Sequence, residues 1–280
     1  MNICRTINQL TQAVNEFKQQ NKTIGLVPTM GALHEGHKSL FERARKENDI
    51  FIASVFVNPV QFNNPEDLEK YPRSEEQDLQ MLETCGCDAV FVPSAEEVYQ
   101  GQEVETWHFG QLEQVMEGKQ RPGHFSGVAN IVSRLFKWIM PDRAYFGEKD
   151  FQQIAIIRDM VSQMQSPVEI VACPIYRESD GLAASSRNRR LSPQARLMAP
   201  KIHYILTKSF EQKDALSLSQ IKSFVEHEFD KYKDFELEYF LLVDDKTLQP
   251  VRQRSVNQGI VGCLAVWLDG VRLIDIQRYW

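Results

Sequence analysis

The sequence predicts an α/β protein in which a Rossmann-like, doubly wound parallel sheet is followed by a smaller C-terminal α+β domain. Over the first part of the chain, short apolar segments alternate with segments of helical periodicity, which is the element order of a parallel sheet. Beyond residue 175 helices are followed by strands, and the last two strands are separated by Asp269-Gly270, a strong signal for a tight hairpin. We therefore expect two domains, residues 1–175 and residues 176–280.

The strands of the first domain are predicted from short apolar runs. Residues 50–57 are apolar without alternation, which is typical of a strand buried on both faces. In residues 126–140 the apolar side chains fall on one helical stripe, so this helix is expected to face the core. The expected strands are 23–28, 50–57, 88–92, 142–146 and 168–172, and the expected helices are 7–20, 36–47, 75–85, 126–140 and 151–163.

The second domain is expected to begin after Cys173-Pro174. A polar stretch that contains Gly and Ser, residues 177–188, follows and is expected to connect the domains. Two helices and then three strands are predicted after it. The expected strands lie near 236–243, 260–268 and 271–276.

The charge of the chain argues against two classes of partner. Acidic side chains number 38 and basic side chains 32, so the formal net charge is −6. No global positive field therefore attracts DNA or an anionic membrane, and we expect neither as a partner. The first twenty residues contain no long apolar segment, and no stretch elsewhere reaches the length that spans a bilayer. We expect a cytoplasmic protein that acts on small molecules.

The five cysteines are scattered and odd in number, so a disulfide framework is not expected. Most of them stand beside apolar residues, which favours reduced, buried thiols. Only Cys85-Gly86-Cys87 suggests a metal or redox site, and it lacks a second pair of ligands nearby. The sequence leaves the role of Cys85 and Cys87 open.

The segment from Met30 to His37 links the first long strand to the next helix. His34 and His37 are three residues apart, so they point the same way on a helix. The helix N-terminus favours a phosphate, and each imidazole can donate to a phosphoryl oxygen as charge builds up on the α-phosphate. Gly36 lets a flat base approach the backbone. The alternative is two histidines on a solvated surface, but the strand, turn and helix together favour a nucleotide site.

A second candidate segment, residues 146–153, directly follows a predicted strand. Ligands of open α/β sheets gather at strand ends. Lys149 is suited to neutralise a β- or γ-phosphate and Asp150 to accept from ribose hydroxyls, while Gln153 lies one turn into the next helix. Taken alone, this segment is better explained as a charged loop with Asp150 as a helix cap.

The third candidate, Ser185-Ser186-Arg187-Asn188, lies on the expected connection between the domains. Two hydroxyls and a guanidinium are a good set for a triphosphate. A mobile loop here would close over ATP and exclude water from a reactive intermediate. A flexible polar linker explains the same residues about as well.

Two amides, Asn58 and Gln61, follow the second long strand and are expected at the same crevice as His34. A neutral amide both donates and accepts, which suits a hydroxylated acid. Arg121 and His124 supply a weaker candidate pair for an anion.

These four segments, together with the run Glu-Asp-Leu-Glu-Lys-Tyr-Pro-Arg at residues 66–73, closely resemble the pantothenate synthetase (pantoate–β-alanine ligase) family. The resemblance is specific from about Thr23 to Leu191 and continues more loosely to Asp275, so it covers nearly the whole chain. It implies that the carboxylate of pantoate attacks the α-phosphate of MgATP to give pantoyl adenylate and pyrophosphate, after which the amine of β-alanine displaces AMP. It also implies a Rossmann domain with a smaller C-terminal lid domain, usually in a homodimer.

The resemblance also implies roles for individual residues. His37 would be the proton donor, His34 its partner on the phosphates, and Lys149 a third catalytic residue. Gln61 and Gln153 would hold pantoate, with Gln61 also near β-alanine and Asn58 as a further substrate contact. The positions implied to line ATP are Met30, Gly31, Ala32, Leu33, His34, Glu35, Gly36, His37, Gly147, Glu148, Lys149, Asp150, Tyr176, Ala184, Ser185, Ser186 and Arg187.

The sequence departs from the family pattern at several positions. Ala184 stands where Leu or Met is common, Tyr176 where a small aliphatic residue is usual next to the adenine, and Arg190 where Tyr is common. After the Tyr-Pro-Arg motif the family often has adjacent acidic residues linked to magnesium. Here Gln77 precedes Asp78, which leaves Asp78 as the candidate metal ligand.

Three other classes of protein are weighed against this one. A class I aminoacyl-tRNA synthetase uses a similar His-x-Gly-His turn, but this chain has no evident basic tRNA-binding domain or lysine-rich second signature. Small nucleotidyltransferases share the turn as well, but assignment to that class would not account for the Ser-Ser-Arg connection or for the second domain. An ATP-binding regulatory module without chemistry would be expected to lack catalytic side chains. In this chain His34, His37, Lys149 and Arg187 are all present.

Overall fold

The structure is a computed structural model that describes residues 1–99, 101 and 104–280. The chain separates into two compact units. The first comprises Met1–Phe109, Arg121–Glu148 and Gln153–Pro174, and the second comprises Gly110–Gln120, Lys149–Gln152 and Ile175–Trp280. The predicted division at residue 175 stays a prediction.

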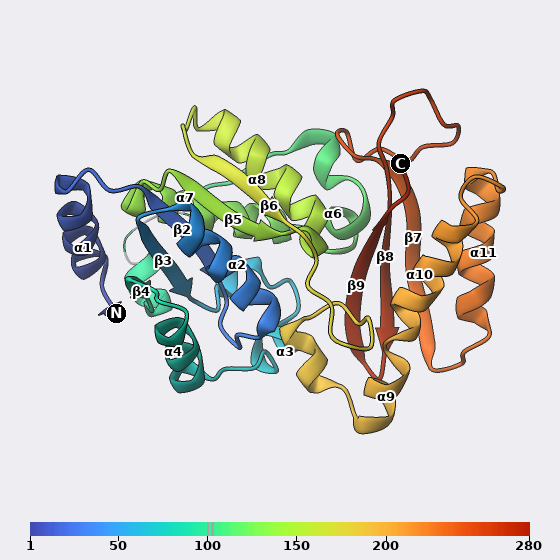
Figure 1. Cartoon of the computed structure of the whole chain (residues 1–280), viewed down its shortest axis with the longest axis horizontal. Helices are drawn as coiled ribbons and strands as arrows, with labels where there is room; N and C mark the ends of the chain where they lie inside the picture. Colours follow the sequence, from blue (N-terminus) through green and yellow to red (C-terminus); the bar gives the residue numbers. More distant parts are fainter. Residues whose placement is uncertain (100, 102–103) are drawn as a thin grey trace. The chain divides into compact units, whose positions relative to one another are not determined.

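The first unit is built on a six-stranded parallel sheet with the strand order β1-β4-β3-β2-β5-β6 (Figure 1). This confirms the predicted Rossmann-like, doubly wound class. The pairing of β1 with β4 was not anticipated, because three residues are too few to carry a recognisable pattern. The strands are β1 (Asn2–Cys4), β2 (Ile24–Thr29), β3 (Ile50–Val55), β4 (Ala89–Phe91), β5 (Arg143–Gly147) and β6 (Glu169–Cys173).

Helices cover both faces of this sheet. Right-handed crossovers place α2 and α4 over one face and α1, α7 and α8 over the other. The longer helices are α1 (Ile7–Gln19), α2 (Glu35–Glu47), α4 (Glu75–Thr84), α7 (His124–Ile139) and α8 (Phe151–Gln163). Shorter helical segments of this unit are η1 (Pro59–Gln61), α3 (Pro65–Glu69) and α5 (Ala95–Tyr99). The segments η2 (Gly110–Glu113) and α6 (Met116–Gln120) belong to the second unit, and η3 (Glu148–Asp150) has its first residue in the first unit and the other two in the second.

Local sequence explains where these helices begin and which face they bury. Thr6 caps α1 by accepting from the backbone N–H of Gln9, whose side chain accepts from the backbone N–H of Thr6 in return, a reciprocal capping box. In α7 the apolar stripe is buried almost along the whole helix, as its periodicity predicts. Phe41 of α2 packs on Phe51 of β3 with ring centroids 5.3 Å apart, and both side chains are fully buried.

The second unit contains a three-stranded antiparallel sheet with helices packed against it. Asp269 and Gly270 both have positive φ, 53° and 67°, as the predicted tight hairpin between β8 and β9 requires. Three helices precede the sheet where two were expected, because Ser192 caps a short additional helix. The elements are η4 (Ser186–Arg190), α9 (Pro193–Met198), α10 (Lys201–Glu211), α11 (Leu218–Asp230), β7 (Phe235–Asp244), β8 (Ile260–Leu268) and β9 (Val271–Arg278).

Two expectations about the whole chain are met. The predicted α+β class of the smaller C-terminal part is confirmed by its three-stranded antiparallel sheet, in the order β7-β8-β9. All five cysteines are free thiols, and all except Cys85 are buried. Within the described ranges, no helix has the length and apolar character needed to cross a membrane.

Candidate active site

The site in the first unit is built around the carboxyl end of β2. The neighbours of β2 in the sheet are β3 and β5, so the segments that follow these three strands emerge at one edge. From β2 the chain proceeds to β3 and β4 on one side and to β5 and β6 on the other, which makes the boundary between β2 and β5 the topological switch point. Ligands of open α/β sheets bind at such a point. The predicted segments 30–37, 58–61 and 147–148 therefore share an edge of the sheet.

The turn that follows β2 is held in place by hydrogen bonds that begin at Thr29, the last residue of the strand. The Thr29 hydroxyl donates to the carbonyl oxygen of Ser54 at 2.7 Å, which joins the ends of β2 and β3. The Thr29 hydroxyl oxygen also accepts from the backbone N–H of Gly31 at 3.2 Å. Gly31 has φ 78° and Ala32 has φ 49°, so two successive residues are left-handed. The chain reverses within this turn and begins α2.

Asp78 of α4 holds the next part of the same turn. Its Oδ2 accepts from the backbone N–H of Ala32 at 2.9 Å, and its Oδ1 accepts from that of Leu33 at 2.8 Å. The Ser74 hydroxyl donates to Oδ1 at 3.2 Å. The Asp78 side chain is buried, with only 2% exposed. The sequence named Asp78 as a metal candidate, and nothing in the sequence indicated this contact with the turn.

The two histidines meet at the start of α2. His34 is the N-cap of the helix, and its Nδ1 accepts from the backbone N–H of Gly36 at 3.1 Å. The ring proton of neutral His34 therefore resides on Nε2. The centroids of His34 and His37 lie 4.1 Å apart, as the predicted spacing requires. His37 stacks on Phe41 at 6.4 Å, which links the pair to the buried face of α2.

Gln61 and Asn58 lie together after β3. The buried Asn58 amide donates to Gln61 Oε1 at 3.2 Å and to the carbonyl oxygen of Gly127 at 3.0 Å. Its Oδ1 accepts from the Tyr99 hydroxyl at 2.6 Å. The Gln61 amide nitrogen lies 2.9 Å from the sulfur of Met30. The structure thus brings two predicted segments into contact and gives Asn58 a position from which it orients Gln61; its direct contact with substrate stays a prediction.

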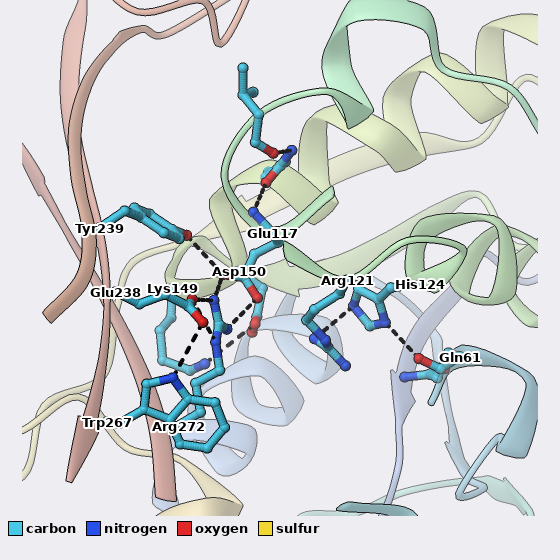
Figure 2. A network of polar contacts seen from close by, with 12 residues as sticks. Gln61, Glu117, Arg121, His124, Lys149, Asp150, Glu238, Tyr239, Trp267 and Arg272 are labelled. Carbon is cyan, nitrogen blue, oxygen red and sulfur yellow. Dashed lines mark hydrogen bonds and ion pairs between the residues drawn. The ribbon is translucent and has the colours of Figure 1, made fainter. Parts of the chain in front are cut away.

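His124 supports Gln61 from α7 (Figure 2). An Arg121 guanidinium nitrogen lies 3.1 Å from His124 Nε2, and His124 Nδ1 lies 2.8 Å from the carbonyl oxygen of Gln61. Arginine can only donate, so Nε2 accepts and Nδ1 carries the proton. A Cβ on Gly127 would stand 2.6 Å from Gln61 Cα, so α7 approaches η1 through a glycine. His124 therefore holds the backbone of Gln61, a role that differs from the anion contact considered for it.

The other predicted residues divide between the two units. Gly147, Glu148 and Gln153 belong to the first unit, whereas Lys149 and Asp150 belong to the second. Lys149 Nζ lies 3.3 Å from Asp150 Oδ1. All these roles in ATP or pantoate binding stay predictions.

The Ser-Ser-Arg segment lies in the second unit at the start of η4. Ser185 caps η4 by accepting from the backbone N–H of Arg187 at 3.3 Å. The backbone N–H of Ala184 donates to the carbonyl oxygen of Tyr176 at 3.0 Å. Ala184 is buried and Tyr176 is 40% exposed, so the tyrosine side chain reaches the surface and the alanine side chain does not.

A charged cluster that the sequence did not reveal ties the segment 110–120 to the sheet of the second unit (Figure 2). The Arg272 guanidinium binds Glu117 at 2.6 and 2.8 Å and also binds Glu238. The Tyr239 hydroxyl donates to Glu117 at 2.8 Å. Burial lowers the pKa of Arg272, but the hydrogen bonds and charges of the two glutamates outweigh burial and raise it. Burial and the charge of Glu117 raise the pKa of Tyr239.

Gln152 joins this cluster to the start of α8. Its Oε1 accepts from the backbone N–H of Glu117 at 2.9 Å, and its amide donates to the carbonyl oxygens of Leu112 and Val115. The residue is 4% exposed. The segment 149–152, which includes Lys149 and Asp150, is thereby anchored within the second unit. No sequence signal distinguishes the buried Gln152 from its neighbour Gln153.

The fit of the site to magnesium can be tested on the described residues. Among residues 1–99, 101 and 104–280, no group of three or more His, Cys, Asp or Glu side chains is placed to hold a metal ion. Both carboxylate oxygens of Asp78 accept from backbone N–H groups. Mg²⁺ usually retains several waters and binds through few carboxylates together with substrate phosphates. The geometry does not fit a metal cage made by the protein alone.

A doubly wound sheet with a histidine pair at the helix N-terminus next to its switch point defines an α/β nucleotide-binding enzyme. Comparison with known proteins identifies the family. The profile of the family described as pantoate-beta-alanine ligase matches residues 2–278. This chain belongs to that family, whose reaction is the ATP-dependent condensation of (R)-pantoate with β-alanine to pantothenate, AMP and pyrophosphate through pantoyl adenylate.

Similar proteins extend over the full chain. Pantothenate synthetases of Porphyromonas gingivalis and Bacteroides fragilis are each 50% identical over 279 residues, which cover 100% of this chain and 99% of each relative. A solved pantothenate synthetase from Thermus thermophilus is 40% identical, with a TM-score of 0.94 and full coverage of both chains. A pantoate-beta-alanine ligase from Francisella tularensis, complexed with beta-gamma ATP and beta-alanine, is 35% identical, with a TM-score of 0.83 over 100% of this chain and 98% of that one. The enzyme class predicted from the sequence is confirmed.

Proposed function

We propose that the edge of the sheet after β2, β3 and β5 performs the adenylation of pantoate, with His34 and His37 acting on the phosphates. The observation that supports this most directly is the geometry of the histidine pair. His34 accepts from the backbone N–H of Gly36 through Nδ1, which leaves its proton on Nε2. The ring centroids of His34 and His37 lie 4.1 Å apart. Donors at a helix N-terminus stabilise charge that develops on a phosphoryl group.

In the first step an oxygen of the pantoate carboxylate attacks the α-phosphorus of ATP. The bond from the α-phosphorus to the oxygen that bridges to the β-phosphate breaks, and pyrophosphate leaves. His37 donates a proton to the phosphates as negative charge increases on them, and His34 assists from the same face of α2. Lys149 neutralises charge on the β- and γ-phosphates.

In the second step the amine of β-alanine attacks the carbonyl carbon of pantoyl adenylate. The mixed anhydride bond breaks, AMP leaves with the bond electrons, and the amine nitrogen loses a proton as the amide forms. Gln61 and Gln153 hold pantoate through amide donors and acceptors, and Asn58 orients Gln61. The Francisella tularensis relative was solved in complex with beta-gamma ATP and beta-alanine, which supports binding of ATP and β-alanine here.

The remaining ATP contacts are proposed from the predicted segments. Met30 to His37, Gly147 to Asp150, Tyr176 and Ala184 to Arg187 are the residues proposed to contact ATP. Ser185 and Ser186 supply hydroxyls and Arg187 a guanidinium for the triphosphate. Tyr176, 40% exposed, offers a ring face to the adenine in place of a small aliphatic side chain.

Magnesium is proposed to enter with ATP. The triphosphate supplies most of the oxygen ligands that Mg²⁺ requires, so the protein need not provide a complete set. Magnesium would lower the charge on the β- and γ-phosphates. Within this chain, Lys149 and Arg187 are the cations proposed to bind the same phosphates.

We also propose a division into residues 1–175 and 176–280, a homodimer and a cytoplasmic location. The family resemblance supports the two-domain organisation and the homodimer. Light scattering coupled to size exclusion tests the dimer. A mass of one chain, 32.4 kDa, at working concentration would contradict it.

The experiment that tests the proposed function is exchange of labelled pyrophosphate into ATP. Exchange should require pantoate and magnesium but not β-alanine, because adenylation alone is reversible. Addition of β-alanine should then release AMP. Absence of exchange with pantoate, or equal exchange with an amino acid plus tRNA, would refute this function.

A further inference from the structure

The turn between β2 and α2 has an unusual backbone. Gly31 and Ala32 are both left-handed, with φ 78° and 49°. Glycine adopts this conformation without strain, but alanine does so at a cost and only where its surroundings hold it. The successive N–H groups of Gly31, Ala32 and Leu33 all donate to oxygens within the protein.

The acceptor for two of these three groups is one carboxylate. Asp78 accepts from Ala32 through Oδ2 at 2.9 Å and from Leu33 through Oδ1 at 2.8 Å, and it is 2% exposed. Successive N–H groups in a turn of this kind form a concave site for an anion, and in many nucleotide-binding proteins that anion is a phosphate. Here the anion is a side chain from α4.

We propose that Asp78 is the positioning residue of this turn: its carboxylate occupies the anion site of the turn and thereby fixes the point at which α2 and its histidines begin. The phosphate contacts of this segment then come from the side chains of His34 and His37, and not from the backbone N–H groups of Ala32 and Leu33. The inference rests on the proposed function, because the turn carries the histidines that act on ATP.

The packing around the carboxylate favours this role over magnesium binding. A Cβ added to Gly31 would lie 2.9 Å from Asp78 Oδ2, so the carboxylate is packed directly against the turn. Each oxygen also accepts from a backbone N–H, and Oδ1 accepts from the Ser74 hydroxyl in addition. A magnesium ligand needs an oxygen that reaches about 2.0–2.1 Å from a hydrated ion in octahedral geometry. Three of the roughly four lone-pair sites of this carboxylate are already occupied by hydrogen bonds within the protein, which leaves little capacity for a metal ion.

Asp78→Asn tests the proposal with little change of volume. The amide offers one acceptor oxygen and places an NH₂ donor against the second backbone N–H. We expect kcat for pantoate-dependent pyrophosphate exchange to fall by about 30-fold or more, because misplaced histidines reduce transition-state contacts. The magnesium concentration at half-maximal rate should remain within about twofold of wild type. A tenfold increase in that concentration would assign Asp78 to the metal and overturn the proposal, as would an unchanged kcat.

Glu76→Gln is the matched control. Glu76 is exposed on the same helix, so its substitution removes one negative charge without contact to the turn. Exchange rate and magnesium dependence should both be unchanged. A loss equal to that of Asp78→Asn would show an effect of charge alone and would contradict a positioning role.

Amide hydrogen exchange tests the turn without any variant or activity. In the wild-type protein without nucleotide, the N–H groups of Ala32 and Leu33 should already be protected, because Asp78 accepts from both. Rapid exchange that slows only when ATP is added would show that the turn binds phosphate directly, and would overturn the proposal even if Asp78→Asn fails to fold. If wild type lacks pantoate-dependent pyrophosphate exchange while these groups are protected, the proposed function fails and the positioning of the turn stands.

Discussion

His34 combines a structural contact with a chemical one in a single ring. Nδ1 caps α2 through the backbone N–H of Gly36, and this contact leaves the proton on Nε2. The spacing of the two histidines could be read from the sequence. The tautomer could not, because it depends on which backbone group meets Nδ1.

Two substitutions separate these roles. In His34→Asn the amide oxygen can replace Nδ1 as the cap, whereas His34→Ala loses the cap and about 1 kcal/mol of stability. Both should lower pyrophosphate exchange by about 100-fold, because both remove the Nε2–H donor. Urea unfolding and the exchange assay measure the two effects.

Ser217→Ala provides the control for loss of a cap alone. Ser217 caps α11 in the second unit by accepting from the backbone N–H of Gln220. This variant should lose about 1 kcal/mol of stability with no change in exchange.

Full activity of His34→Asn would contradict the assignment of Nε2 as a donor.

Asp244 at the end of β7 predicts a pH dependence of stability. Hydrogen bonds from the backbone of Thr247 and from the side chain of Gln258 lower the pKa of Asp244 to about 2 in the folded protein, against 3.8 in the unfolded chain. The folded state therefore favours the charged form. The contribution to stability is complete above pH 4 and is lost as the pH falls through about 2.

Asp244→Asn should remove this contribution, which is about 1 kcal/mol after allowance for screening at a partly exposed site. The difference in unfolding free energy between wild type and the variant should be constant between pH 5 and 7 and should shrink below pH 4. Urea titrations at each pH measure it. A difference that grows toward low pH would have the wrong sign for this mechanism.

At the scale of elements, the contact of α7 with η1 depends on one glycine. A Cβ on Gly127 would come within 2.6 Å of both Gln61 Cα and the carbonyl oxygen of Val60. The helix stripe was recognised from its apolar periodicity, but the polar side of the helix start, where His124 binds the backbone of Gln61, was not. Periodicity reports which face is buried and does not report which partner it meets.

Gly127→Ala should therefore force α7 and η1 apart. We expect a loss of about 1–3 kcal/mol in the free energy of unfolding, as for other cases of overpacking. The KM for pantoate should rise, because the backbone of Gln61 moves with η1. Steady-state kinetics and urea unfolding check both effects.

Lys137→Ala is the comparison on the exposed face of α7. Its ion pair with Glu105 is exposed on both sides, so its loss should cost less than about 1 kcal/mol and leave the KM for pantoate unchanged. An unaltered KM in Gly127→Ala would show that the packing of α7 against η1 does not affect the binding of pantoate.

At the scale of the whole molecule, the five thiols predict a simple pattern of reactivity. Cys85 is partly exposed, whereas Cys4, Cys87, Cys173 and Cys263 are buried. Burial raises the pKa of the Cys87 thiol to about 12 and also raises that of Cys85. Thiolate is the reactive form of cysteine, so the burial of Cys87 and its raised pKa both lower its reactivity.

A thiol reagent at pH 8 should therefore modify Cys85 first and all five cysteines only after unfolding. In Cys85→Ser the early phase should disappear while exchange activity is retained. Mass spectrometry of the labelled protein identifies the modified residue. Early labelling of Cys87 would contradict its burial.

The fold class and most elements could be predicted because each depends on patterns within about fifteen residues. The strand at Ile260–Leu268 and the helix at Phe151–Gln163 have the predicted bounds. Contacts between distant residues could not be predicted in this way. Asp78 meets Ala32 across 46 positions, and Arg272 meets Glu117 across 155. The resemblance to a family gave the residues of the candidate site, but not the groups that hold those residues in place.

The pairing of β1 with β4 also has a consequence for synthesis on the ribosome. Asn2 pairs with Ala89, so the earlier strand has no partner until β4 has emerged, and β2 lacks its second neighbour until Arg143 of β5 follows. At roughly 5–20 residues per second, β1 waits on the order of 4–17 s beside the growing chain. A three-residue strand offers little edge on which a wrong partner can pair during that interval. We therefore expect the short length of β1, which also made the strand unrecognisable in the sequence, to limit wrong pairing of the nascent chain.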